Sequence, residues 1–214
     1  ERTLSDVFDQ SASGESLIDM MALDLLVGSG GVLSHAPRRE QTLSMLIDAF
    51  QPEGITRLAV DSIFMMPHLG VLAAVDEKAA TDVFERDCII YLGTCVAPVH
   101  AAKGTPKLGE PCATWELTGP DGSQHGELQV GDLALLPLAA GAEAQLTLRP
   151  GRRWDLGSGP GQEHTATVHG GVVGLVLDAR GRPVQVPEDP GERRDRVRRW
   201  SAALRLYDGD GEEG

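Results

Sequence analysis

The sequence contains no long hydrophobic run, and this absence excludes the usual membrane-spanning helix. No apolar stretch approaches the length that a helix needs to cross a bilayer. Residues 1–6 are polar and have none of the hydrophobic core of a signal peptide. At 214 residues, the chain is long enough for one large domain or two small ones, each with a core of its own.

Positive charge and cysteine are both scarce. Asp and Glu number 32 against 19 Lys and Arg, which gives a formal net charge of -13. A field of that sign repels phosphate backbones and anionic lipids, so we expect neither nucleic acid nor a membrane as a partner. Cys88, Cys95 and Cys112 are an odd number in a chain of ordinary size, which indicates a reducing, cytoplasmic setting rather than a disulfide scaffold.

Common motifs of catalytic and metal sites are also missing. The sequence has no Gly-x-Ser-x-Gly nucleophile elbow, no C-x-x-C pair, and no zinc-binding spacing among its six histidines. We therefore predict no catalytic residue and no metal site in this chain. One alternative is a free-standing enzyme acting through Asp155, His164 and His169, which requires the three side chains to converge in one pocket.

The periodicity of the sequence changes near residue 88 and predicts two parts of different class. Residues 1–87 alternate between helical and strand patterns, which is typical of an α/β layer with a largely parallel sheet. Residues 88–188 carry short β-prone runs between Gly, Pro and Asp, which is typical of a small β-barrel or sandwich. We therefore expect an α/β part followed by a mainly β part.

Residues 189–207 are predicted to form a C-terminal helix, with Asp189 as its N-cap. Its apolar face should dock on the α/β part, since that part needs a second layer over its sheet. The members of this face are Val197, Trp200, Ala203, Leu204 and Tyr207. We also expect residues 178–183 to form the tip of a β-hairpin, and residues 208–214 to be a disordered acidic tail.

The most informative pattern is a strand, a glycine-rich turn and a helix between residues 25 and 50. The turn consists of Gly28, Ser29, Gly30 and Gly31, and is called the glycine turn below. Glycine has no Cβ and tolerates positive φ, so a ligand can approach its backbone closely. The spacing matches neither G-x-G-x-x-G nor a P-loop, so the turn is either a ligand contact or a purely structural feature.

Residues 25–33, 57–61 and 67–73, taken together, resemble the C-terminal subdomain of the glutamate mutase accessory (reactivating) protein family. That family belongs to the actin-like ATPase superfamily, in which a strand, a Gly-Gly turn and a helix form the adenosine motif. The resemblance covers residues 17–86 and implies that the glycine turn is the nucleotide-binding element. In it, Gly28, Gly30 and Gly31 would face the adenosine, with Ser29 in the same turn.

The resemblance further implies that full-length relatives bind ATP and Mg²⁺ and reactivate an adenosylcobalamin-dependent mutase. Their phosphate-binding elements should precede the adenosine motif, but only 24 residues precede Leu25 here. Actin-like catalysis needs contacts from both lobes around one cleft. We therefore expect a C-terminal fragment that is not catalytic alone and holds no nucleotide or metal by itself. Its partners would be the missing N-terminal lobe and, by resemblance, such a mutase.

The alternative is a non-catalytic protein-interaction module whose glycine turn is only structural.

Overall fold

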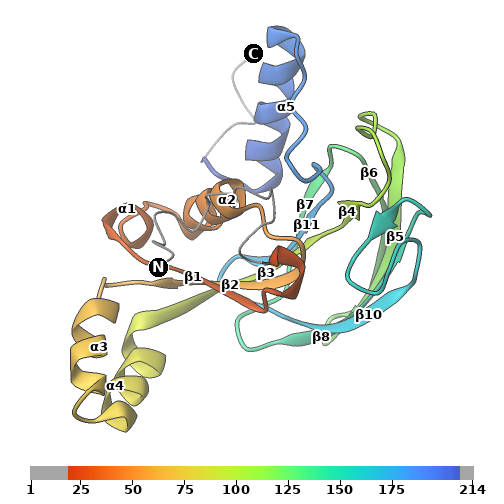
Figure 1. The fold of residues 1–214 in the computed structure, drawn as a ribbon. Helices are drawn as coiled ribbons and strands as arrows, with labels where there is room; N and C mark the ends of the chain where they lie inside the picture. Colours follow the sequence, from red (N-terminus) through yellow and green to blue (C-terminus); the bar gives the residue numbers. More distant parts are fainter. Residues whose placement is uncertain (1–18, 208–214) are drawn as a thin grey trace, which may run out of the picture.

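The computed structural model describes residues 19–207 as a mixed α/β fold, mostly strands, with a C-terminal helix (Figure 1). A five-stranded sheet forms its centre, in the order β1-β2-β3-β11-β7. These strands are β1 (Leu25–Gly28), β2 (Gly54–Asp61), β3 (Ile89–Ala97), β11 (Gly174–Asp178) and β7 (Leu133–Leu136). The pairs β1–β2 and β3–β11 are parallel, and β2–β3 and β11–β7 are antiparallel. The carboxyl ends of β2 and β11 therefore lie at opposite edges of the sheet.

A second sheet has four antiparallel strands in the order β10-β8-β5-β6. They are β10 (His164–His169), β8 (Glu143–Pro150), β5 (Pro111–Gly119) and β6 (Gly122–Gln129). Burial alternates along β8, as expected of a strand with one face toward the core. A small third sheet pairs β4 (Val99–His100) with β9 (Trp154–Asp155).

The helices are η1 (Met20–Ala22), α1 (Gly31–Ser34), α2 (Arg39–Phe50), α3 (Met66–Ala73), α4 (Glu77–Val83), the π-helical turn η2 (Phe84–Cys88) and α5 (Pro190–Ala203). Helices α1, α2 and α5 lie on one side of the central sheet, α3 and α4 lie at one end of it, and the short η1 packs at the start of β2 (Figure 1). Asp76 and Asp189 cap α4 and α5, because their carboxylates accept hydrogen bonds from the first free N–H groups. None of the helices in residues 19–207 has both the length and the apolar character needed to span a bilayer.

Two hydrophobic clusters hold these layers together. On one face of the central sheet, Leu58, Val60 and Val176 pack against α2 and α5. On the other face, Val96 and Leu177 pack against the inward side chains of the four-stranded sheet. The order of layers is therefore helices, five-stranded sheet, four-stranded sheet.

The central sheet crosses the boundary that we predicted at residue 88. Strands β1 and β2 come from residues 1–87, whereas β3, β7 and β11 come from residues 88–188. The change in periodicity is real, but it marks a change in what covers the sheet, from helices to a second sheet. Because β2 pairs with β3 across this boundary, the first segment has no sheet of its own, whereas the second segment contributes three strands to the shared sheet and forms the four-stranded sheet alone.

The predicted hairpin tip at residues 178–183 is wrong. Strand β11 ends at Asp178, and the next residues turn back without a returning strand. The reason is that Asp178 is fully buried and pairs with Arg180 and Arg182, so these side chains fold inward instead of capping a solvent-exposed turn.

The C-terminal helix docks near its C-terminal end, on β7 as well as on the α/β part where it was expected, and Val197 of the predicted apolar face is 47% exposed. Trp200 is 9% exposed and Leu204 is 1% exposed, and both belong to the cluster that includes α2. The helix ends at Ala203, since Arg205 adopts a left-handed φ of 55°, so Tyr207 lies beyond it and is exposed. The predicted acidic tail, residues 208–214, lies outside the described residues.

Candidate functional site

The glycine turn lies at the carboxyl end of β1, beside the carboxyl end of β2. Gly28 is opposite Val60 in the parallel ladder. A Cβ on Gly28 would stand 2.7 Å from the side chain of Leu33 and 2.8 Å from that of Leu46. Gly28 is buried, and the packing of Leu33 and Leu46 leaves little room for a side chain there.

Gly30 and Gly31 differ from Gly28 in having open space around them. A Cβ added to either residue would meet no atom within 4 Å. Gly30 has a φ of 120°, a conformation that side chains rarely adopt, whereas Gly31 begins α1 with no such restriction. Within residues 19–207 no packing contact explains the absence of a side chain at Gly31, and none of these residues blocks close approach to its backbone.

Asp61, at the end of β2, connects the glycine turn to α3. Its carboxylate accepts hydrogen bonds from Ser29 Oγ at 3.1 Å, from Met65 N at 3.1 Å and from Met66 N at 2.8 Å. Its backbone oxygen accepts a hydrogen bond from Ser34 Oγ at 2.7 Å. One residue therefore fixes the turn, α1 and the start of α3 relative to one another.

Asp61 remains ionised although it is 0% exposed. Burial by itself would raise the pKa of this carboxyl, but the hydrogen bonds from Met66, Met65 and Ser29 hold the pKa below its usual range. Among the described residues, no cation forms an ion pair with it. A negative charge held only by neutral donors disfavours a phosphate beside the turn, so the turn suits the uncharged part of a ligand.

Sequence reasoning did not place Asp61 in the candidate site. The signal that could have found it is the parallel pairing of β1 and β2. The carboxyl ends of parallel strands meet at one edge of a sheet, so Ser29, which follows β1, comes close to Asp61, the last residue of β2.

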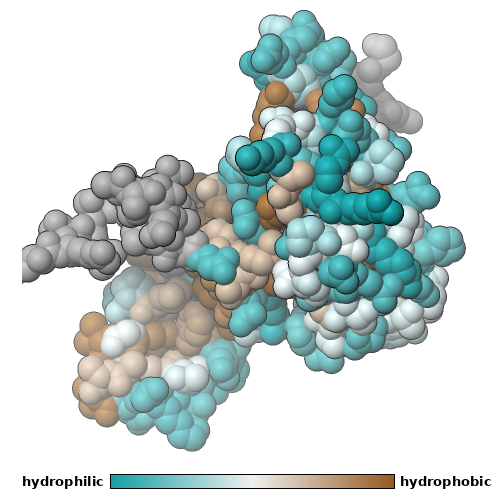
Figure 2. Space-filling view, turned by 45° about the vertical axis from the view of Figure 1, so that its right-hand side comes forward, coloured by the Kyte–Doolittle hydropathy of each residue, from teal (hydrophilic) through white to brown (hydrophobic). Residues whose placement is uncertain are grey.

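Exposed apolar side chains follow Asp61 in the chain, on and beside α3. Figure 2 shows a hydrophobic patch at its lower left, over α3 and α4. Its exposed members include Ile63, Phe64, Val71, Leu72 and Val75, and Val75 is 87% exposed.

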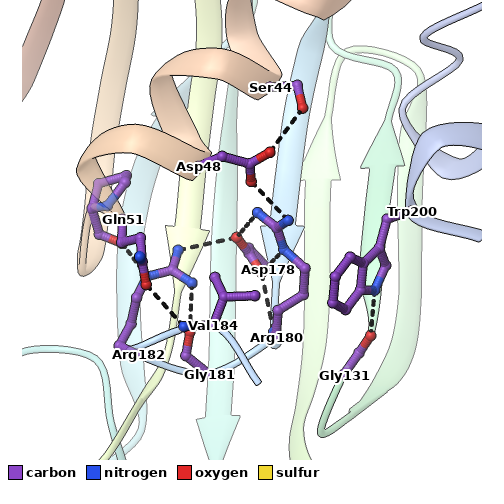
Figure 3. Close-up of polar contacts among 11 residues, drawn as sticks. Ser44, Asp48, Gln51, Gly131, Asp178, Arg180, Gly181, Arg182, Val184 and Trp200 are labelled. Carbon is purple, nitrogen blue, oxygen red and sulfur yellow. Dashed lines mark hydrogen bonds and ion pairs between the residues drawn. The ribbon is translucent and has the colours of Figure 1, made fainter. Parts of the chain in front are cut away.

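A second buried carboxylate lies at the opposite edge of the central sheet (Figure 3). Asp178 accepts hydrogen bonds from Arg180 Nε and Nη2, both at 2.9 Å, and from Arg182 Nη2 at 3.0 Å. Arg180 also donates to Asp48 Oδ1 at 2.8 Å. Burial would raise the pKa of Asp178, but the two guanidinium groups hold it below its usual range.

Trp200 seals this ion-pair cluster from the side of α5. Its indole N–H donates to the Gly131 oxygen at 2.8 Å, and the Arg180 guanidinium lies 5.1 Å from the ring centre. The side chains of Asp178, Arg180 and Arg182 are buried, that of Asp48 is half exposed, and the cluster joins α2, β11 and α5 beside a cavity of about 260 Å³ that Asp48, Arg180 and Trp200 help to line (Figure 3).

The residues of the free-standing-enzyme hypothesis do not converge. His164 and His169 both line a groove against the central sheet, but Asp155 does not. The Asp155 carboxylate instead accepts hydrogen bonds from the Gly157 and Gly159 N–H groups and shapes its own loop.

The three cysteines are free and buried. Burial raises the pKa of Cys95 and of Cys112 to about 12, so neither is a thiolate at neutral pH. Within residues 19–207, no group of three His, Cys, Asp or Glu residues is arranged to hold a metal ion.

Comparison with known families gives one match. A family model described as MutL protein matches residues 7–88. This segment contains β1, the glycine turn and Asp61, and it ends immediately before β3. No curated protein and no solved structure matches the chain.

Proposed function

We propose that this chain is a C-terminal fragment of an actin-like ATPase related to the accessory proteins of adenosylcobalamin-dependent glutamate mutase. In this proposal the glycine turn supplies the adenosine side of a nucleotide cleft. The observation that carries it is the open backbone at Gly30 and Gly31, held in place by Asp61. The MutL family match, which covers the same segment, points to a relation with glutamate mutase accessory proteins.

The chemistry around the turn supports a nucleoside contact rather than a phosphate contact. A flat, uncharged base can lie against backbone that carries no side chains, whereas the nearby Asp61 carboxylate repels anions. The phosphates of ATP and their Mg²⁺ would therefore be held by a second lobe, outside these 214 residues. Without that lobe the chain would not hydrolyse ATP, because actin-like catalysis uses both walls of the cleft.

The partners follow from the same proposal. The first is the N-terminal lobe of the same protein, and the second is an adenosylcobalamin-dependent mutase that the whole protein would serve.

A calorimetric titration of ATP and Mg²⁺ tests the site, using this chain and the longer protein that contains it. We expect weak or no binding by the chain, since phosphate contacts supply much of the affinity in such clefts. In the longer protein, Gly31→Val should abolish binding, because the new side chain points into open space and leaves the fold intact. Gly70→Val is the matched control, since a Cβ at Gly70 also meets nothing within 4 Å.

Two results would count against the proposal. Submicromolar binding or turnover by the chain alone would mean that the site lies elsewhere. Wild-type ATP binding by a folded Gly31→Val protein would show that the turn is not the adenosine contact.

A protein-interaction module is the second candidate function, and the exposed apolar patch on α3 favours it. Val71, Leu72 and Val75 offer an apolar surface without any need for a ligand at the turn. This candidate predicts that ATP changes neither the stability nor the binding properties of any length of the protein.

A further inference from the structure

A groove of about 590 Å³ lies on the face of the central sheet away from α2, beside the edge strand β10. Its polar lining includes Arg57, His164 and His169, and its apolar lining includes Leu25, Ile55 and Leu156. None of the four residues of the glycine turn lines it, so it is separate from the nucleotide proposal.

Arg57 is the feature that distinguishes this groove. Its guanidinium carbon lies 3.6 Å from the ring centre of Tyr91, so the group is stacked and fixed in orientation. Its Nε is buried and has no hydrogen-bond partner, and no ion pair to Arg57 occurs within the described part of the chain. In a protein with a net charge of -13, a stacked cation without an acidic partner is unusual.

The two histidines are each held through one ring nitrogen. His164 Nδ1 lies 2.6 Å from Ser158 Oγ, and His169 Nδ1 lies 3.3 Å from a Glu143 carboxylate oxygen. Thr94 fixes the end of β10 to β3, since its hydroxyl bonds both the N–H and the oxygen of His169. These hydrogen bonds therefore fix the orientation of His164 and His169 in the wall of the groove without a ligand.

We propose that this groove binds a small organic carboxylate with an apolar body. A stacked guanidinium keeps its N–H edge free, and that edge matches the two oxygens of a carboxylate. The apolar side chains around it would cover the rest of the ligand. Asp24 also lines the groove, and its charge disfavours a doubly charged phosphate relative to a single carboxylate.

Titration of the full chain with hexanoate, followed by NMR of the arginine Nε–H and histidine ring signals, tests this proposal. We expect hexanoate to bind and to shift the signals of Arg57, His164 and His169. Hexanamide, which lacks the charge, and inorganic phosphate should bind more weakly. Arg57→Gln should weaken hexanoate binding by roughly tenfold or more, the effect of losing a charge-assisted hydrogen bond.

Two further variants separate the site from folding and from net charge. Arg57→Lys keeps the charge but loses the two-pronged contact, so it should bind hexanoate less well than wild type while folding normally. Arg152→Gln removes an exposed positive charge outside the groove and should leave binding unchanged. Equal binding of hexanoate and phosphate, or wild-type affinity in Arg57→Gln, would overturn the proposal. Neither result depends on whether the glycine turn binds a nucleotide.

Discussion

Two buried aspartates end strands at opposite edges of the same sheet, and their surroundings differ completely. Asp61 ends β2 and Asp178 ends β11, and both are 0% exposed. Asp61 is held by two backbone N–H groups and a hydroxyl, whereas Asp178 is held by two guanidinium groups. Both environments keep the carboxyl pKa low, but only the second neutralises the charge.

The two edges of the sheet therefore differ in whether the charge of the buried carboxylate is compensated. At the Asp178 edge, α2, β11 and α5 meet around neutralised charges, and the indole of Trp200 covers them. At the Asp61 edge, the carboxylate organises backbone around it and leaves Gly30 and Gly31 uncovered. The candidate site therefore lies at the edge where the buried carboxylate, that of Asp61, has neutral hydrogen-bond donors and no cation beside it among the described residues.

Replacing Asp178 by Ala should give the largest loss of stability. The change leaves Arg182 without its carboxylate and Arg180 with only Asp48, while both guanidinium groups stay buried. Breaking a buried ion pair from one side costs about 3–5 kcal/mol. Urea denaturation measures the free energy of unfolding. Asp195→Ala, an exposed position on α5, is the control and should change it little. Equal small effects at both positions would contradict the described ion-pair cluster.

Replacing Asp61 by Asn should have a smaller and more local effect. An asparagine amide keeps one acceptor oxygen, but its NH₂ group faces N–H and O–H donors that then have no acceptor. Leaving a buried polar group without a partner costs about 1–3 kcal/mol. Hydrogen exchange should quicken at the Met65 and Met66 amides more than in β11. Asp76→Asn is the matched control, because Asp76 caps α4 at an exposed position where Asn caps equally well. Uniform loss of protection across the sheet would show that Asp61 supports the whole fold.

The pH dependence of stability should show the smallest of these effects. Asp178 has a lower pKa in the folded state than the ordinary value of 3.8, so the unfolded chain takes up its proton first as the pH falls. The contribution of Asp178 is therefore complete above that value and is lost as the pH drops through the lower folded pKa. The urea midpoint of the wild-type protein should fall as the pH is lowered from neutral to acidic. The midpoint of Asp178→Asn should fall less steeply over the same range. Parallel curves for the two proteins would refute a lowered pKa at this residue.

Local patterns in the sequence predicted several elements well. The strand and the helix expected on either side of the glycine turn, between residues 25 and 50, are β1 and α2, with the short α1 between the turn and α2. The hydrophobic periodicity that predicts each of them lies within the element itself, so the prediction requires no knowledge of distant residues. The Asp189 cap and the burial of Trp200 follow from the same kind of local signal.

Long-range pairing could not be predicted in this way. β11 lies between β3 and β7, and nothing in a five-residue apolar run specifies those neighbours. The sequence around Arg180 is typical of an exposed turn, and its burial depends on Asp48 from a distant helix. Likewise, the glycine turn was evident, but its contact with Asp61 depends on the parallel pairing of β1 and β2.

The position of β11 also sets an order for assembly as the polypeptide leaves the ribosome. β1, β2 and β3 can pair once residue 97 has left the ribosome, but the other side of β3 stays open until residues 174–177 follow. The antiparallel strands made in between can form their own sheet during this interval, since β5, β6, β8 and β10 pair among themselves. The family-matched segment ends before β3 begins, so expressed alone it would leave β2 with an unpaired edge and a strong tendency to self-associate.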